Sequence, residues 1–244
     1  MNKKFLVIGN PIKHSLSPKL HNYWIKKNNL KASYDKKLLE KDEIQQLILD
    51  VREDKIHGLN VTVPFKKTII PFLDTLSEEA KNSQSVNTVY KIKDKVIGDN
   101  TDIYGFKKGL ETANQIIKNK DALILGAGGV VSSIIIALKE MQISKIYLSN
   151  RTKLKALELK KLFPEIEIIE WGQVSSFDIM INATSIGLNN KDEINIDYKK
   201  ISKKKFFYDV IYNPEETNFL RRAKEFGAHT ENGKMMFVYQ AQKA

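Results

Sequence analysis

The sequence predicts an α/β protein with two domains, of which the second is a doubly wound parallel sheet. Three observations lead to this prediction. The 244 residues, 42% of them hydrophobic and 28% charged, suffice for two modest hydrophobic cores. Strand-like and helix-like segments alternate through the second half of the chain, as in parallel βαβ units. Where this alternation begins, residues 123–131 form an apolar strand, a glycine turn and the start of an apolar helix.

The first domain begins with a strand and a helix. Phe5–Gly9 is expected to be a buried strand that ends in a turn. A helix is expected to begin at Ser17, with this serine as the N-cap and Pro18 in the first turn. Ser15 places a second hydroxyl at the same helix N-terminus, where free N–H groups suit a carboxylate. A strand over 32–36 and an amphipathic helix over 41–51 are expected next.

The following strand carries polar side chains suited to chemistry. Alternation along residues 58–66 places Asn60 and Thr62 on one face. The opposite face is apolar and consists of Leu59, Val61 and Val63. Pro64 ends the strand pairing and delivers Lys66 near the strand end. A lysine in such a place is usually a solvated surface residue. The two polar neighbours of Lys66 make a functional role an equal alternative.

Asp102 comes shortly after a predicted hairpin. A helix around 71–81 precedes this hairpin, whose strands are expected over 85–92 and 96–98. An aspartate before a helix commonly caps it, and Asp102 suits that role. The polar residues and two glycines around Asp102 favour a role beyond capping.

The second domain is predicted from regular alternation. Strands are expected around 145–148, 166–169, 177–181 and 206–210, and helices through 134–138, 152–163 and 216–226. Right-handed crossovers then form a doubly wound sheet that binds its ligand at the strand C-termini. Gly126 allows the tight turn, and Gly128 lets the backbone approach a pyrophosphate beside the free N–H groups of the helix. Val131, at the third position of the pattern, is bulkier than close helix–strand packing usually allows.

The end of the second strand of this domain indicates the cofactor. An NAD site has an acidic residue about 20 residues beyond the glycines for the ribose 2′-OH, whereas a 2′-phosphate needs cations there. The sequence has Asn150, Arg151 and Thr152, then Lys153 and Lys155, and no carboxylate. Arg151 can bind a phosphate bidentately or cover the adenine face. The predicted cofactor is NADP rather than NAD; the alternative, with Asn150 as a helix cap and Arg151 solvated, leaves the missing acid unexplained.

Composition excludes several classes of function. Without cysteine the chain has no disulfide, thiolate metal site or cysteine nucleophile, and its four histidines lack metal-ligand spacing. The net charge of +11 comes from dispersed lysines, and the longest basic run, 203–205, flanks a strand, so nucleic acid is not an expected partner. No run approaches the roughly 18 apolar residues that cross a membrane, and Met1–Lys4 leads directly into a strand, so we expect a cytoplasmic protein.

The motifs, taken in order, resemble those of the shikimate dehydrogenases from Gly9 to Gln240. In the first half the matching segments are Ser15–Pro18 with His21 and Asn22, Asn60–Lys66, Val86–Thr88, and Asn100–Asp102 with Gly105. In the second half they are Gly126–Gly129, Asn150–Thr152, Asn182–Ser185 with Gly187, Asp209–Tyr212 with Pro214 and Thr217, and Gly233 with Met236 and Gln240. Val130 and Val131 depart from the family, which usually has a small pair there.

The resemblance implies a substrate domain over 1–102, rejoined by 232–244, and an NADP-binding Rossmann domain over 103–231, with the active site in the cleft between them. The implied reaction is reversible hydride transfer between NADPH and the C3 carbonyl of 3-dehydroshikimate, in aromatic amino-acid biosynthesis. Lys66 and Asp102 are the implied catalytic residues, a cation and an orienting anion at the reacting oxygen. Whether Lys66 moves the proton or only stabilises charge is left open.

The resemblance also implies the binding residues. The substrate is expected to contact polar side chains that include the catalytic pair: Ser15, Ser17, Asn60, Thr62, Lys66, Asn87, Asp102, Tyr212 and Gln240. The cofactor is expected to contact the glycine turn and the loops beside it: Gly126, Ala127, Gly128, Gly129, Val130, Asn150, Arg151, Thr152, Lys155, Ala183, Thr184, Ser185, Val210 and Gly233. No metal is implied.

Two alternatives stay open at this point. A quinate/shikimate dehydrogenase with relaxed substrate use and NAD as cofactor prefers an acid where Arg151 stands. A non-catalytic NADP-binding sensor on the same fold has no need of Lys66 and Asp102, which are both present. The expected partners are the small-molecule substrate and NADP, without nucleic acid or membrane, and a homodimer is a possible assembly.

Overall fold

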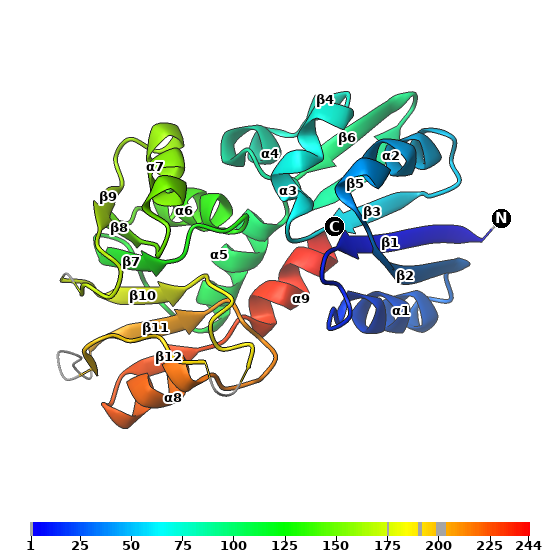
Figure 1. The fold of residues 1–244 in the computed structure, drawn as a ribbon. Helices are drawn as coiled ribbons and strands as arrows, with labels where there is room; N and C mark the ends of the chain where they lie inside the picture. Colours follow the sequence, from blue (N-terminus) through cyan, green and yellow to red (C-terminus); the bar gives the residue numbers. More distant parts are fainter. Residues whose placement is uncertain (1, 175, 190–191, 199–203) are drawn as a thin grey trace. The chain divides into compact units, whose positions relative to one another are not determined.

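The computed structural model describes residues 2–174, 176–189, 192–198 and 204–244. Contacts between residues divide the chain into two compact units (Figure 1). Unit 1 comprises Met1–Ile103 and Gln240–Ala244, and unit 2 comprises Tyr104–Tyr239. Residues 232–239, which we expected with the first domain, cluster with unit 2. Lys203, part of the longest basic run, lies outside the described residues.

Unit 1 is built on a six-stranded mixed sheet in the order β2-β1-β3-β5-β6-β4. Its first three strands are parallel: β1 (Lys3–Gly9), β2 (Ala32–Leu38) and β3 (Gly58–Val61). The predicted hairpin is confirmed, because β5 (Thr88–Ile92) and β6 (Lys95–Asp99) pair antiparallel.

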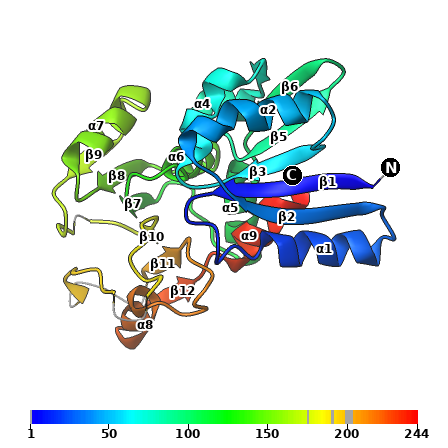
Figure 2. The ribbon, with the colours of Figure 1, turned by 45° about the vertical axis from the view of Figure 1, so that its right-hand side comes forward.

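Helices cover both faces of this sheet. They are α1 (Ser17–Lys27), α2 (Ile44–Arg52), α3 (Phe65–Thr68) and α4 (Glu78–Ser83). Ile44 and Leu47 of α2 pack in the core that contains Ile8, whereas Ile25 of α1 packs in the cluster that contains Val7. Neighbouring residues of a strand point to opposite faces, so α1 and α2 lie on opposite sides of β1. Figure 2 shows α1 running alongside β1 and β2.

Two predictions about element bounds in unit 1 are wrong. In place of a helix over 71–81, the chain forms a 3₁₀ turn at Ile70–Phe72, then the two-residue β4 (Thr75–Leu76) and α4. A separate 3₁₀ turn at Lys41–Glu43 precedes α2. The strand expected over 58–66 ends at Val61, because Pro64 takes the N-cap position of α3. Leu59 and Val61 are buried as predicted, but Val63 lies beyond the strand and is 58% exposed.

The start of α1 also differs from the prediction. Leu16, not Ser17, occupies the N-cap position and makes no side-chain capping bond. Ser17 is already helical, and its backbone N–H donates to Ser15 Oγ at 3.3 Å. The capping hydroxyl therefore comes from Ser15, and the Ser17 hydroxyl is available for other partners.

Unit 2 contains an all-parallel sheet in the order β12-β11-β10-β7-β8-β9. Its strands are β7 (Asp121–Leu125), β8 (Lys145–Ser149), β9 (Glu167–Ile169), β10 (Ile179–Asn182), β11 (Phe206–Asp209) and β12 (His229–Glu231). The chain starts at β7, extends the sheet to one side, and then crosses to β10 on the other. The doubly wound sheet is thus confirmed, and its direction reverses between β7 and β10, where such sheets bind ligands.

The helices of unit 2 are α5 (Asp102–Thr112), α6 (Val131–Glu140), α7 (Lys153–Leu162), α8 (Asn218–Glu225) and α9 (Lys234–Lys243). The boundary between the units falls within α5 and α9. Val131, the bulky residue after the glycines, is completely buried at the start of α6, so the packing accommodates it. No helix in the described part of the chain is long and apolar enough to span a membrane.

Candidate active site

A buried ion pair joins α3 and α5 at the start of each helix. Lys66 Nζ donates to Asp102 Oδ2 at 2.6 Å, and the two side chains are only 11% and 7% exposed. The backbone around Lys66 is fixed as well, because its carbonyl accepts from the N–H of Val86 at 2.8 Å. The two residues predicted to be catalytic are therefore in direct contact within unit 1.

Asp102 is free for this pair because a neighbour caps the helix. Asn100 Oδ1 accepts from the backbone N–H groups of Asp102 and Ile103, at 3.0 and 3.4 Å. The Asn100 amide in turn donates to the Ser85 carbonyl at 2.7 Å. Of the two roles open for Asp102, capping is thus taken by Asn100, and the carboxylate serves the ion pair.

Asn87 brings a second group to Asp102. Its Nδ2 has two hydrogens and three acceptors within hydrogen-bond distance: Asp102 Oδ1 at 3.0 Å, Thr101 Oγ1 at 2.9 Å and Gln240 Oε1 at 3.3 Å. The carboxylate therefore has a cation on one oxygen and an amide on the other. Gln240 belongs to the returning C-terminal segment of unit 1 and so joins the predicted substrate residues.

Asn60 connects Asn87 with Tyr34 and, through Tyr34, with Ser17. Its Nδ2 donates to the Asn87 carbonyl and to Thr88 Oγ1, each at 3.1 Å. Its Oδ1 accepts from the Tyr34 hydroxyl at 2.6 Å. A hydrogen bond from the Ser17 side chain also reaches Tyr34, where it lowers a pKa that burial raises far above the usual value for tyrosine. Ser17, Asn60, Asn87 and Asp102 thus belong to one hydrogen-bonded chain.

Thr62, Ser15 and Tyr212 make contacts of other kinds. Thr62 follows β3, and its methyl group packs against Gly9, where a Cβ would meet it at 2.6 Å. Ser15 accepts from the Ser17 backbone, as described above. Tyr212 belongs to unit 2, where its ring stacks on Phe237 with centroids 4.4 Å apart. Contacts of these three residues with substrate stay predictions.

In unit 2, the glycine turn directly follows β7. Gly126 has φ +111°, and a Cβ there would lie 2.8 Å from the Ala183 carbonyl oxygen, so other residues are strained at this position. Gly128 is exposed, and a Cβ there would meet nothing closer than 3.9 Å. Gly126 thus shapes the turn, whereas Gly128 faces open space that suits a pyrophosphate. Ala127, Gly129 and Val130 complete the turn before α6.

Exposed cations follow the second strand. Asn150 Nδ2 donates to the Thr152 carbonyl at 2.8 Å and thereby bends the chain between β8 and α7. Arg151 and Lys155 are exposed, and neither forms an ion pair within the described part of the chain. Lys153 instead pairs with Glu170 at 2.9 Å. Two cations therefore remain for a phosphate, as the NADP prediction requires.

A buried carboxylate organises the loops after β10 and β11. Asp209 accepts from both Asn182 Nδ2 at 3.1 Å and the Thr217 hydroxyl at 2.6 Å. Burial raises the pKa of the Asp209 carboxyl to about 6, although these hydrogen bonds lower it. Asn182 Oδ1 holds the predicted cofactor residue Thr184 through its hydroxyl at 2.7 Å. This network fixes the turn that contains Ala183, Thr184 and Ser185.

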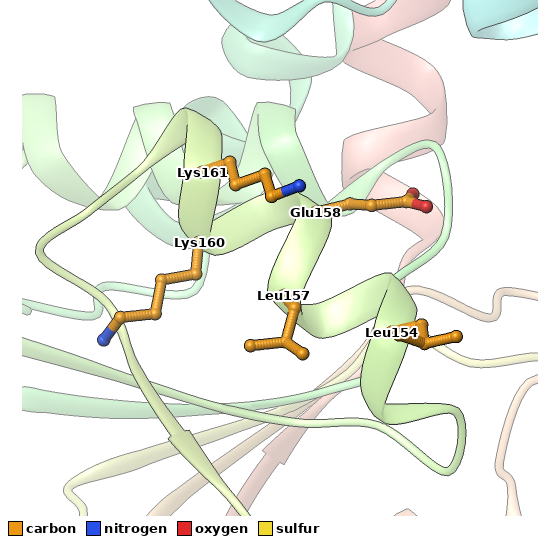
Figure 3. Close-up of a pocket in the computed structure, with 5 residues that line it drawn as sticks. All are labelled: Leu154, Leu157, Glu158, Lys160 and Lys161. Carbon is orange, nitrogen blue, oxygen red and sulfur yellow. The ribbon is translucent and has the colours of Figure 1, made fainter.

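The remaining predicted cofactor residues, Val210 and Gly233, are in contact with each other. A Cβ on Gly233 would lie 2.2 Å from the Val210 carbonyl oxygen, so only glycine fits. The hollow drawn in Figure 3 is different: it lies on the exposed side of α7, and its lining contains no predicted site residue. It is lined by Leu154, Leu157, Glu158, Lys160 and Lys161.

Comparisons with known proteins give the family. Residues 7–89 match the model of the shikimate dehydrogenase substrate binding domain, and residues 110–217 match that of shikimate / quinate 5-dehydrogenase. Shikimate dehydrogenase (NADP(+)) of Pelagibacter ubique (strain HTCC1062) is 73% identical over 244 residues, covering 100% of this chain and 92% of that protein. The chain belongs to the shikimate dehydrogenase family.

Solved structures of this family share the whole fold. Shikimate dehydrogenase from Aquifex aeolicus is 37% identical with a TM-score of 0.90, covering 99% of this chain and 90% of that one. Shikimate 5-dehydrogenase from Thermus thermophilus, solved in complex with NADP(H) and shikimate, is 30% identical with a TM-score of 0.89, covering 98% and 90% of the two chains. The resemblance read from the motifs is thereby confirmed at the level of family and fold.

Sequence reasoning left three residues out of the predicted site, although Asn100 and Thr88 belong to the matching motifs. Asn100 caps α5, Thr88 accepts from Asn60, and Tyr34 bonds Asn60 from the other side. The motif His21-Asn22 carried a signal for Tyr34, because both of its side chains contact that residue.

Proposed function

We propose that the chain is an NADP-dependent shikimate dehydrogenase, which reversibly reduces 3-dehydroshikimate to shikimate. The observation that carries this proposal is the buried contact of 2.6 Å between Lys66 and Asp102, surrounded by amides that suit substrate hydroxyls. The curated relative that is 73% identical bears the same name, including its cofactor. Shikimate and NADP(H) are both present in the structure from Thermus thermophilus.

Lys66 is suited to act on the reacting oxygen. An ammonium has three hydrogens, and one of them is used by Asp102. The others have no partner within the described residues, so they are available to the substrate oxygen. When a ketone becomes an alkoxide, such a donor stabilises the developing charge and is placed to transfer the proton. Asp102 orients the ammonium, and Asn87 holds the Asp102 carboxylate in place.

The residues present in unit 2 fit NADP. The exposed Gly128 leaves room for the pyrophosphate at the start of α6, while Arg151 and Lys155 are unpaired within the described chain and suit the 2′-phosphate. When bound, the reduced nicotinamide supplies the hydride that adds to the carbonyl carbon. The network of Asp209, Asn182 and Thr184 holds the adjacent loop rigid.

The test is a steady-state assay of the purified chain with shikimate and NADP⁺, followed by NADPH absorbance. We expect reduction of NADP⁺, a higher kcat/KM for NADP⁺ than for NAD⁺, and a higher kcat/KM for shikimate than for quinate. Folded protein that produces no NADPH from shikimate refutes the proposal. Comparable rates with quinate and NAD⁺ support the relaxed quinate/shikimate dehydrogenase instead, and binding of NADP without turnover supports a sensor.

A cytoplasmic location and a homodimer stay predictions. Light scattering coupled to size-exclusion chromatography measures the assembly directly. The basic surface predicts no specific partner, so DNA affinity that falls steeply with salt would contradict our interpretation of the charge.

A further inference from the structure

Tyr34 of β2 is buried against the substrate residues and immobilised by α1. It is 3% exposed. The His21 ring stacks on it with centroids 4.1 Å apart and an interplanar angle of 1°. The Asn22 side chain bonds both backbone groups of Tyr34, donating to its carbonyl at 2.7 Å and accepting from its N–H at 3.0 Å. Two consecutive residues of one helix thus hold a single tyrosine.

The directions of the hydrogen bonds at Asn60 follow from their partners. The Asn87 backbone carbonyl can only accept, so the amide nitrogen of Asn60 must face it at 3.1 Å. The amide oxygen of Asn60 therefore faces Tyr34, whose hydroxyl must donate the bond of 2.6 Å. Since Tyr34 has one hydroxyl hydrogen, the Ser17 hydroxyl must be the donor in its bond with Tyr34.

The hydrogen bonds from Asn60 to the catalytic pair run in the same donor-to-acceptor direction. Asn60 Nδ2 donates to Thr88 Oγ1 at 3.1 Å, and Thr88 donates to Asn87 Oδ1 at 3.1 Å. Asn87 then donates to Asp102. Every bond from Ser17 to the carboxylate therefore points the same way, and both hydrogens of the Asn60 amide are used.

We propose that Tyr34 is a positioning residue of the substrate site, which anchors Asn60 so that its side chain offers only an acceptor lone pair to a substrate hydroxyl. This inference rests on the proposed function for the identity of the substrate. A hydroxyl can donate to the free lone pair of Asn60 Oδ1, whereas a carbonyl or ether oxygen there would place two acceptors against each other. Tyr34 thereby contributes to selection of a polyhydroxylated substrate, without touching it.

The first test is a double-mutant cycle on Tyr34 and Asn60. Tyr34→Phe removes one oxygen and keeps the ring that stacks on His21. We expect kcat/KM for shikimate to fall roughly tenfold, mainly through KM for shikimate, with KM for NADP⁺ unchanged. Asn60→Ala lowers it further, and adding Tyr34→Phe to that variant has little additional effect, because Tyr34 acts through Asn60. The proposal would be overturned if the fold-losses of kcat/KM in the two single variants simply multiplied in the double variant.

A matched control shows whether the loss of kcat/KM in Tyr34→Phe is specific to Tyr34 or follows from removing any buried tyrosine hydroxyl. Tyr208 is a fully buried tyrosine in unit 2, and its hydroxyl has no partner within the described residues. We expect Tyr208→Phe to leave kcat/KM for shikimate unchanged. A loss equal to that of Tyr34→Phe would show a general effect of removing a buried hydroxyl, and would overturn the proposed role of Tyr34.

The second test does not depend on turnover. The Asn60 side-chain amide signals can be assigned in an ¹⁵N NMR spectrum by their loss in Asn60→Ala. Their hydrogen exchange with water should accelerate several-fold in Tyr34→Phe and stay unchanged in Tyr208→Phe. Unchanged exchange in Tyr34→Phe overturns the anchoring of Asn60. An inactive wild type would refute the proposed function alone, while this measurement still decides the role of Tyr34.

Discussion

Replacing Lys66 with methionine tests whether the buried ion pair is kept for catalysis rather than for stability. The pair distance is 2.6 Å and the side chains are 11% and 7% exposed, so water screens neither charge effectively. Lys66→Met preserves side-chain length and leaves the Asp102 carboxylate buried without its cation. Breaking a buried pair in this way costs about 3–5 kcal/mol. Loss of the donor at the reacting oxygen should lower kcat by roughly 10²–10⁴-fold.

The double variant Lys66→Met/Asp102→Asn separates the two roles. It contains neither charge, and the amide that replaces the carboxylate still has an oxygen to accept from Asn87. Removing both partners is far less costly than removing one, so we expect most of the lost unfolding free energy to return. Turnover should not return, because the donor is still absent.

The two tryptophans allow unit 1 to be followed by itself. Trp24 lies in α1 of unit 1, and Trp171 packs against the core of unit 2. In a Trp171→Phe background, fluorescence during urea unfolding reports the surroundings of Trp24. The four proteins of the Lys66 and Asp102 cycle are compared in this background, and kcat is measured on the same preparations.

Two results would refute this reasoning. A double variant as unstable as the sum of the single variants would mean that the charges do not compensate each other. A Lys66→Met variant that retains kcat within tenfold of wild type would remove Lys66 from the reacting oxygen, whatever its effect on stability.

Three further predictions concern the cofactor and two buried titratable groups. Arg151→Ala should raise KM for NADP⁺ at least tenfold with little change for NAD⁺, because this exposed guanidinium is unpaired within the described chain and free to bind the 2′-phosphate. Arg221→Ala is the control, and equal effects of the two substitutions would contradict the assignment. Burial raises the pKa of Asp209 to about 6 from 3.8, so the folded state holds the Asp209 proton more tightly than the unfolded state does. The unfolding free energy of wild type relative to Asp209→Asn should therefore fall by up to about 3 kcal/mol as pH rises from about 4 to 6. A difference that does not change with pH would contradict this. Burial lowers the pKa of His21 to about 4 from 6.5, so the unfolded state binds this proton more tightly than the folded state does. The unfolding free energy of wild type relative to His21→Phe should therefore fall as pH falls from 6.5 to 4. A difference in unfolding free energy that stays constant across that range would contradict this.

The fold was predictable wherever burial covers both faces of an element. The strands β7, β10 and β11 are buried along nearly their whole length and appear in the sequence as continuous apolar runs. The strand β12 has the sequence His229-Thr230-Glu231, which contains no apolar residue. It forms because its backbone pairs with β11 at the sheet edge, a tertiary effect that no local pattern contains. The same holds for the two-residue β4 beside β6.

The site was predictable in its residue types but not in its bonding. Lys66 and Asp102 were identified from motifs, and the structure joins them. Whether Asp102 or Asn100 caps α5 was beyond sequence reasoning, because both side chains are good caps and only the backbone geometry selects one. Tyr34 was missed because its partner Asn60 lies 26 residues away and the two meet through sheet register across β1.

The arrangement of unit 1 explains why so polar a site can be buried. Asn60 and Asn87 each bond several partners in unit 1, and the two oxygens of Asp102 are divided between Lys66 and Asn87. Rotation of the carboxylate would break both bonds, so the ammonium is held in one direction before substrate arrives. Substrate binding then requires little reordering of these side chains, which favours catalysis by preorganised charge. Burial of these charges costs free energy that the apolar core of unit 1 offsets. Loss of one partner should therefore destabilise the unit strongly, and loss of both should destabilise it far less.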